Sequence, residues 1–163
     1  MKKKTAKINY PDEIEKSVSE LLAKLQVEAK VTVEEIHEDT EKEEEASFKV
    51  NIETADSGLL IGHHGETINS LQLLAGVISY KKFGKWVRIL IDVGDYRKMR
   101  EESIKEMVNR IIAEVEQSGK PVELPYLSPL ERRIVHMMLS ANERIMSESS
   151  GEGKDRRVTI KPR

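Results

Sequence analysis

Two short clusters in the 163-residue sequence combine residue types that could hold a chain of phosphates. The first is Gly62-His63-His64-Gly65, in which two glycines three positions apart enclose two histidines. Glycine lacks a Cβ, so the backbone of such a loop can approach a sugar-phosphate chain closely. The second is Arg132-Arg133-Ile134-Val135-His136, in which an arginine and a histidine stand four positions apart. Side chains at i and i+4 share one face of a helix, so this pair could contact the same polyanion.

The surroundings of the glycine loop leave two interpretations open. Ile61 and Ile68 flank the loop and could border a narrow groove for unstacked bases. A helix that starts after Gly65 would also turn free amides and the positive end of its dipole toward a phosphate. The alternative is an ordinary corner between two helices. The two histidines predict that the loop contacts a phosphate mainly through hydrogen bonds, because most imidazole side chains are uncharged at neutral pH.

Adjacent histidines also occur as metal ligands, but this pair has no neighbour in the sequence that completes a ligand set. The chain contains no Cys, and no further His lies near the loop. Zinc sites in proteins use three or four such ligands. We therefore expect no metal ion and no cofactor.

The arginine-histidine cluster also has two interpretations. Arg132, Arg133 and His136 could form an exposed binding surface, or they could be the solvated face of a helix. The apolar residues of the same helix are expected to be buried on another side; they are Leu130, Ile134, Met137, Met138 and Ala141. Arg157 and Lys161, near the C-terminal end, could extend a phosphate-binding surface or form a solubilising tail.

Hydrophobic periodicity predicts the elements that position the glycine loop. Helical spacing predicts helices over residues 11–25, 57–61 and 68–84, and alternation predicts strands over residues 27–33, 46–52 and 87–93. The order is helix, strand, strand, helix, helix, strand.

A second unit is predicted after Gly94. Asp95 is a good N-cap for a helix through residue 118, and residues 121–125 predict a short edge strand. Ser128 and Glu131 form a capping box around Pro129, which predicts the start of another helix. Two strands follow, near residues 143–147 and 156–160. We therefore predict an α+β protein of two small α/β domains, over residues 1–94 and 95–163.

Composition excludes several functional classes. The absence of Cys excludes thiol catalysis and thiolate metal sites, and no apolar run is long enough to span a bilayer. Only seven aromatic residues are present, which argues against modules that stack bases on aromatic side chains.

The net charge of −2 is unevenly distributed along the chain. Residues 57–100 carry seven basic and three acidic side chains, whereas eight acidic residues lie between Glu34 and Glu45. Screening limits what a phosphate senses to about 10 Å, so the local balance matters more than the total. We interpret the acidic run as a solvated strand edge and hairpin loop that nucleic acid avoids.

The order of elements around the glycine loop resembles a KH domain of type II, αββααβ, whose GxxG loop clamps single-stranded nucleic acid by its backbone. The usual Lys or Arg between the glycines is replaced by His here. The second cluster resembles the R-three-H (Arg-x3-His) domain, which binds single strands on a helix face. This combination is similar to the Jag/KhpB family of SpoIIIJ-associated proteins. The similarity extends over Gly65-Glu66-Thr67-Ile68-Asn69-Ser70-Leu71-Gln72 and Asp95-Tyr96-Arg97.

The resemblance implies a cytoplasmic, non-enzymatic protein that binds single-stranded RNA, and conceivably single-stranded DNA, as an RNA chaperone or post-transcriptional regulator linked to the cell envelope, division or sporulation. The site residues that it implies are Ile61, Gly62, His63, His64, Gly65 and Ile68 in the KH domain and Arg132, Arg133 and His136 in the R-three-H domain. No catalytic residue is expected.

The family also implies partners. These are a small KhpA-type KH protein or a second copy of the chain, and, indirectly, a membrane insertase of the YidC/Oxa type. Members often carry a further small N-terminal domain and a linker, neither of which we expect in this chain. Two alternatives to RNA binding are a protein-interaction adaptor and a metal-free nuclease. The nuclease is weakly supported, because His136 is the only candidate for proton transfer.

Overall fold

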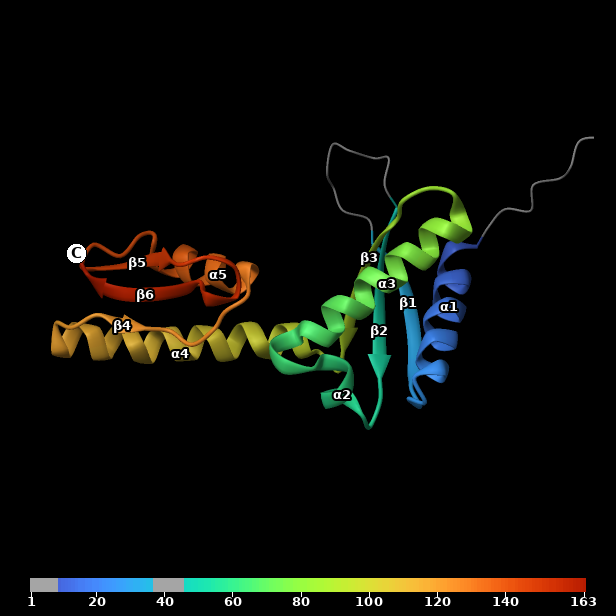
Figure 1. Ribbon diagram of the computed structural model, residues 1–163, viewed down its shortest axis with the longest axis horizontal. Helices are drawn as coiled ribbons and strands as arrows, with labels where there is room; N and C mark the ends of the chain where they lie inside the picture. The colour runs from blue at the N-terminus through green and yellow to red at the C-terminus, as the bar shows by residue number, and fades with distance from the viewer. Residues whose placement is uncertain (1–8, 37–45) are drawn as a thin grey trace, which may run out of the picture. The chain divides into compact units, whose positions relative to one another are not determined.

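A computed structural model describes residues 9–36 and 46–163 of the chain (Figure 1). The chain divides into two units, Met1–Tyr96 and Arg97–Arg163, and each unit has its own hydrophobic core. Both units combine helices with a small three-stranded sheet, which confirms the α+β class.

The first unit has the element order αββααβ. It contains α1 (Tyr10–Lys24), β1 (Lys30–Ile36), β2 (Ser47–Glu53), α2 (Ser57–Ile61), a 3-10 turn (His63–Gly65), α3 (Glu66–Phe83) and β3 (Arg88–Val93). The strand order is β1-β2-β3, with β1 antiparallel and β3 parallel to β2. Helix α1 packs over β1 and α3 over β3 on the same side of the sheet (Figure 1).

The core of the first unit follows from alternation on the central strand. Phe48, Val50 and Ile52 of β2 point to one face and are fully buried, together with Ile14 and Val18 of α1. Successive residues of a strand alternate between faces, so Lys49 and Asn51 of β2 lie on the other face of the sheet. This packing places the loop between α2 and α3 at one end of the sheet.

Two lysines at the end of α3 have structural partners. Lys82 Nζ lies 2.7 Å from Glu13 Oε2 and 3.0 Å from Ser17 Oγ on α1, and Lys85 lies 4.7 Å from the ring centre of Tyr10. These contacts connect α3 to α1 across the face of the sheet. These contacts give Lys82 and Lys85 a structural role that does not require a nucleic acid.

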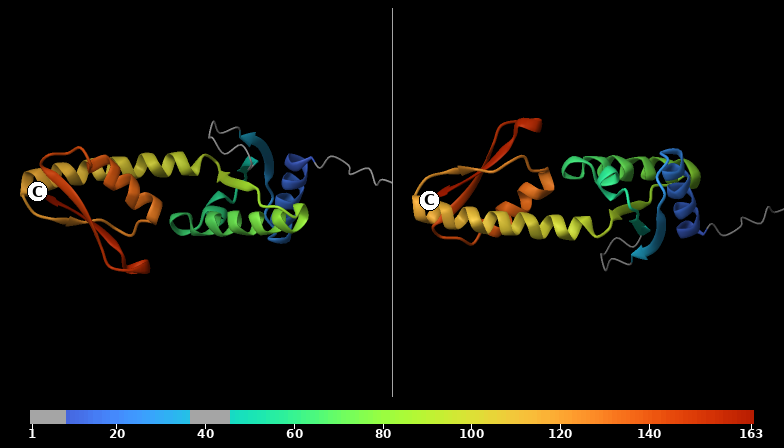
Figure 2. Two further views of the ribbon diagram at one scale, coloured as in Figure 1. Left: turned by 90° about the horizontal axis from the view of Figure 1, so that it is seen from above. Right: turned by 90° about the horizontal axis from the view of Figure 1, so that it is seen from below.

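The second unit packs two helices against an antiparallel sheet. It contains α4 (Tyr96–Ser118), β4 (Val122–Glu123), α5 (Pro129–Leu139), β5 (Ile145–Ser150), a 3-10 turn (Gly153–Asp155) and β6 (Arg157–Pro162). Tyr96 itself belongs to the first unit. The strand order is β4-β6-β5, which places the short β4 at an edge, as predicted. Figure 2 shows α4 running along this sheet with α5 beside it.

The predicted capping box starts α5. Ser128 N donates to Glu131 Oε2 at 2.6 Å, and Glu131 N donates to Ser128 Oγ at 3.3 Å. The second oxygen of Glu131 accepts a hydrogen bond from Arg100 Nε on α4, at 2.8 Å. A local cap and a contact between helices therefore meet at one buried carboxylate.

The predicted buried stripe of α5 is correct only in part, because Ile134 and Met138 pack against the core while Ala141 is exposed. Val135 and Leu139 are buried, whereas Leu130 and Met137 are 64% and 65% exposed. Because Glu131 faces inward to reach α4, the buried side of the helix is shifted from the stripe expected from hydrophobicity alone. Apolar surface therefore lies beside the cationic face of α5.

Three smaller predictions need correction or lie outside the described residues. Strand β1 begins at Lys30, after the predicted start at Val27, which is nevertheless buried. Asp95 directly precedes α4 but has a φ of 57°, whereas N-cap residues usually adopt extended backbone. Of the acidic run, residues 37–45 lie outside the described residues, and Glu34 and Glu35 are exposed on the edge strand β1.

Candidate nucleic-acid interface

The backbone of the GxxG loop is held in conformations that favour glycine. Gly62 has φ 69° and ψ −171°, and Gly65 has φ 81°. A Cβ at Gly62 would lie 2.0 Å from Oγ1 of Thr67, so no other residue fits without moving the start of α3. His64, between them, is also left-handed at φ 51°. The loop therefore turns sharply and presents its backbone at the start of α3.

The two histidines between the glycines lie against each other. Their ring centres are 4.0 Å apart with an interplanar angle of 69°, an edge-to-face arrangement. His63 is exposed and His64 is half-buried. His63 is therefore the side chain of this pair with the greater access to a ligand.

The predicted groove residues occupy different depths. Ile61 is half-buried against the core, and Ile68 is only 1% exposed, so Ile68 supports the loop from beneath. Leu59, on the short helix α2, is 65% exposed and was not predicted as a site residue. The apolar surface next to the loop is therefore contributed by Leu59 and Ile61. Leu59 lies three positions before Gly62, and an apolar residue at this spacing was the sequence signal that could have identified it as a site residue.

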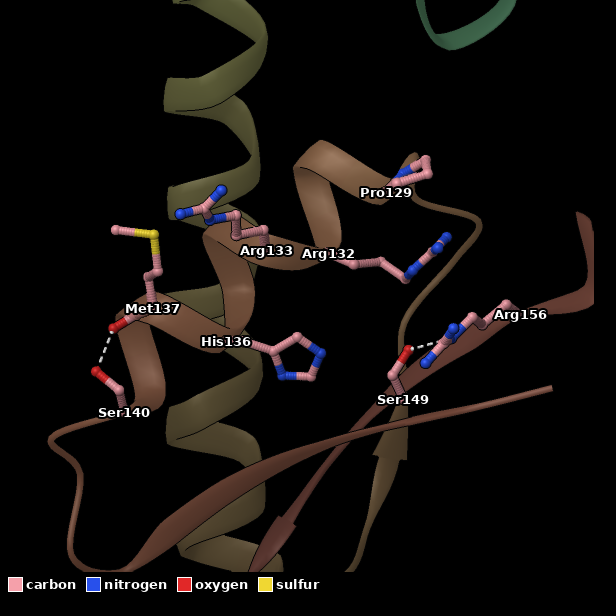
Figure 3. A pocket seen from close by; sticks show the side chains of 8 residues that line it. All are labelled: Pro129, Arg132, Arg133, His136, Met137, Ser140, Ser149 and Arg156. Atoms are coloured by element: carbon pink, nitrogen blue, oxygen red, sulfur yellow. Dashed lines mark hydrogen bonds between the residues drawn. The ribbon is translucent and has the colours of Figure 1, made fainter. Parts of the chain in front are cut away.

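A pocket of about 490 Å³ lies on the face of α5 that carries the second cluster (Figure 3). It brings together all three predicted residues of that cluster. The lining residues are Pro129, Arg132, Arg133, His136, Met137, Ser140, Ser149 and Arg156. No acidic side chain lines this pocket, so its cationic groups would act on a bound anion without an opposing carboxylate.

Hydrogen bonds orient the polar side chains of the pocket. Arg132 Nη1 donates to the carbonyl oxygen of Leu127 at 2.8 Å, and Arg156 Nε donates to Ser149 Oγ at 3.0 Å. The side chains of Arg132, His136 and Arg156 point into the space between α5 and the strands (Figure 3). Each guanidinium group has five N–H donors, so both arginines retain donors for a ligand.

Arg157 and Lys161, which could have extended a phosphate-binding surface, do not line this pocket. Arg157 lies with its guanidinium 5.6 Å from the ring centre of Tyr126 and donates to the backbone oxygen of Lys154, and Lys161 forms an ion pair with Glu148. The pocket residue is instead Arg156. Two adjacent arginines, Arg156 and Arg157, are visible in the sequence as candidates for binding an anion. Only the structure shows that Arg156 is the one that lines the pocket.

The first unit carries a second concave surface between α3 and β3, of about 270 Å³. Its lining includes Gly76, Trp86 and Arg88, and the rings of Tyr80 and Trp86 are 5.5 Å apart. Trp86 is 52% exposed, and the exposed apolar residues around it on α3 are Leu73, Leu74 and Val77. Helix α3 is therefore apolar on its outer side as well as on its core side.

Within residues 9–36 and 46–163, no group of three or more His, Asp and Glu side chains could hold a metal ion. Among those same residues, no helix has the length and apolar character needed to cross a membrane.

Comparison with known proteins assigns both units. The KH domain of KhpA/KhpB matches residues 13–91, and the R-three-H domain matches residues 102–162. The RNA-binding protein KhpB of Clostridium symbiosum is 33% identical over 124 residues, which are 76% of this chain. The chain belongs to the KhpB (Jag) family. The KhpB proteins of Lactiplantibacillus plantarum and Bacillus subtilis are 36% and 29% identical over 111 and 123 residues.

The chain spans about half, or less, of the curated KhpB proteins that it matches. The aligned region covers 54% of the Clostridium symbiosum protein, 34% of the Lactiplantibacillus plantarum protein and 59% of the Bacillus subtilis protein. The matched part of this chain is 68% to 76% of its length and includes residues of both units.

Proposed function

We propose that this KhpB-family chain binds single-stranded RNA through two surfaces, the GxxG loop and the pocket on α5. In this proposal residues 1–94 form the KH part and residues 95–163 the R-three-H part. The relatives that this chain matches are named RNA-binding protein KhpB. Two weak sites in one chain raise the apparent affinity for an RNA that is long enough to reach both.

The observation that carries the proposal is the convergence of Arg132, His136 and Arg156 on a pocket that Arg133 also lines and that has no acidic lining (Figure 3). Guanidinium groups bind phosphate through paired N–H donors, and exposed Met137 offers apolar surface for a base or sugar beside them. This arrangement suits one or two nucleotides of an unpaired strand.

The GxxG loop supports the second contact. Its backbone can approach phosphates because Gly62 and Gly65 lack side chains, and the positive end of the α3 dipole lies next to the loop. Leu59 and Ile61 provide apolar surface beside the loop. Nucleotides would be held mainly by their backbone, with no base stacked on an aromatic residue at the loop.

Fluorescence anisotropy with a labelled single-stranded RNA tests the proposal. The double substitution Arg132→Ala with His136→Ala should weaken binding, whereas Arg110→Ala should not, because Arg110 is an exposed arginine of α4 that does not line the pocket. Equal affinity of the parent and the double variant would reject the pocket as an RNA site.

The loop is tested by His63→Asp with His64→Asp. Aspartate tolerates left-handed backbone, so the change at His64 should preserve the fold while repelling phosphate. A matched control is Lys16→Ala with Lys24→Ala, which changes the net charge by the same amount on exposed positions of α1. The loop variant should lose affinity and the α1 variant should retain it.

We also propose that the chain acts in the cytoplasm and catalyses no reaction. The pocket holds a single histidine and no carboxylate, whereas cleavage of a phosphodiester by general acid–base catalysis needs two placed groups for proton transfer. Incubation with labelled RNA should leave the RNA intact. A protein-interaction adaptor is not favoured, because the matched relatives are named RNA-binding proteins.

The outer side of α3 supports a protein partner in addition to RNA. Exposed Leu73, Val77 and Trp86 form apolar surface of a kind that marks protein contacts. We propose that a KH protein of the KhpA type, or a second copy of this chain, covers it. Val77→Glu should abolish association with a KhpA-type protein in size-exclusion chromatography and leave RNA binding by the pocket unchanged.

Association with a YidC/Oxa-type membrane insertase is the second partner that the family resemblance implies, and we propose it as an indirect association. Copurification of the insertase with a tagged chain, before and after ribonuclease treatment, tests this. Retention after ribonuclease would show an association that does not depend on RNA.

A further inference from the structure

The second glycine of the loop lies against a single aromatic ring, that of Tyr96. A Cβ at Gly65 would be 3.2 Å from Cε1 of Tyr96 and 3.4 Å from its phenolic oxygen. Gly65 is buried, whereas its neighbour His63 is exposed. The face of Gly65 that lacks a side chain is therefore occupied by the ring of Tyr96, and the opposite side of the loop remains available to a ligand.

The backbone before Tyr96 explains how the ring reaches the loop. Gly94 and Asp95 are both left-handed, with φ of 55° and 57°. Two consecutive left-handed residues turn the chain sharply as it leaves β3, and Gly94 N donates to the oxygen of Ile52 on β2 at 3.2 Å. This hydrogen bond ties the turn to the central strand. Tyr96 then packs against the core of the first unit.

The loop depends on such support because its backbone is intrinsically strained. His64 adopts a conformation that is uncommon for a residue with a side chain, and strained backbone persists only where its surroundings hold it. Thr67 lies against Gly62 at the start of the loop, and Tyr96 lies against Gly65 at its end. Each glycine thus has a specific side chain beneath it.

We propose that Tyr96 is a positioning residue for RNA binding, which holds the GxxG loop in the conformation that accepts phosphates. The proposal rests on the proposed function and adds a residue to it. The ring packs against Gly65 and thereby fixes the orientation of the loop amides and of the start of α3. A side chain that only filled the core would contribute stability to the whole unit and have no particular effect on the loop.

The test compares Tyr96 with Tyr10, a second half-buried tyrosine that packs on the same core from α1. Tyr10 lies 4.9 Å from Phe83 and 6.1 Å from Phe48 between ring centres. The variants Tyr96→Leu, Tyr96→Phe and Tyr10→Leu are made in the full chain. Three quantities are measured: RNA affinity, thermal unfolding, and hydrogen exchange of the loop amides.

We expect Tyr96→Leu to weaken RNA binding about tenfold, as loss of a supporting side chain does at other binding sites. Exchange at the amides of His64 and Gly65 should accelerate in this variant, and Tyr96→Phe should restore both properties. Tyr10→Leu should lower the unfolding temperature while leaving affinity unchanged below it. Equal loss of affinity in Tyr96→Leu and Tyr10→Leu, or unchanged exchange in Tyr96→Leu, would overturn the proposal.

A second measurement does not depend on a substitution that could unfold the unit. In the parent chain labelled with 3-fluorotyrosine, added RNA should shift the fluorine signal of Tyr96 and leave that of Tyr10 in place. An unmoved Tyr96 signal at saturating RNA would overturn the proposal. If the Tyr96 signal does not move but the His63→Asp, His64→Asp variant loses RNA binding, the GxxG loop is still supported as an RNA site. The role of Tyr96 and the role of the loop are therefore tested separately.

Discussion

The imidazole of His136 is bound to the neighbouring strand through Ser147. Nδ1 of His136 lies 2.8 Å from Oγ of Ser147, so β5 fixes the orientation of a side chain that α5 carries into the pocket. The hydrogen bond occupies one ring nitrogen and leaves Nε2 for a ligand. The contact joins two residues eleven positions apart and depends on how the helix packs against the strand.

Removing this hydroxyl should weaken RNA binding. We expect Ser147→Ala to lower affinity about fivefold, because a hydrogen bond that orients a binding group contributes about 1 kcal/mol. Ser150→Ala is the matched control, since Ser150 lies on the same strand, is exposed and does not line the pocket. Anisotropy titrations of both variants give the comparison, and equal affinities would argue against a role for Ser147.

Arg156 should contribute one phosphate contact, and Arg157 none. For single strands the logarithm of affinity falls with the logarithm of salt concentration by about 0.7 for each neutralised phosphate. Arg156→Ala should therefore reduce the slope by about 0.7. Arg157→Ala should leave the slope unchanged, because Arg157 lies over Tyr126. Titrations between low and physiological salt measure both slopes. A reduced slope in Arg157→Ala alone would place the phosphate elsewhere.

RNA affinity should rise as the pH falls from about 8 to about 6, because imidazole side chains gain positive charge in this range. The variant His63→Lys with His64→Lys should bind more tightly at pH 8 and lose much of this dependence. His136 lies in the other surface, so a pH profile of the His136→Asn variant separates the contributions of the two surfaces. A flat pH profile of the parent would contradict the prediction.

Glu131 should make the second unit sensitive to acid. Burial by itself raises the pKa of this carboxyl, but hydrogen bonds from Arg100 and from the amide of Ser128 outweigh burial and leave the pKa below its ordinary value of 4.5. A lowered folded pKa contributes stability that is fully present above about pH 4.5 and is lost as the pH falls through the lowered value.

The substitution Glu131→Gln tests this contribution. At pH 7 it should lower the free energy of unfolding by about 1 to 3 kcal/mol, because it removes charge-assisted hydrogen bonds from a buried site. Between pH 5 and 3 the variant should lose less stability than the parent. Urea unfolding at several pH values measures both effects, and Glu148→Gln, at an exposed ion pair, is the control. Parallel pH dependence in parent and variant would show that another carboxyl is responsible.

The element order and the chemistry of both motifs could be predicted from the sequence because their signals are local. The alternation of Phe48, Val50 and Ile52 predicted a strand with one buried face, and the capping box of Ser128 and Glu131 predicted the start of α5. Periodicity and capping depend on residues within a few positions of each other.

The errors arose where two interpretations of a local pattern were equally good. Leu130 and Met137 fit a buried stripe by spacing, but α5 buries Glu131, Val135 and Leu139 and exposes them. Arg156 and Arg157 are neighbours of the same type, but Arg156 precedes β6 whereas Arg157 is its first residue and pairs with β5. Such choices depend on contacts between residues that are distant in the sequence.

The sequence by itself determined that the chain has a GxxG loop between two helices and an Arg-x3-His face on a capped helix, because both follow from residue type and spacing. Only the tertiary structure decided that Tyr96 lies beneath Gly65, that Ser147 holds His136 and that Arg156 completes the pocket. The physical reason is that side chains from separate elements meet only after the helices and strands have packed. A motif thus specifies which groups can bind, and packing specifies which of them face the ligand.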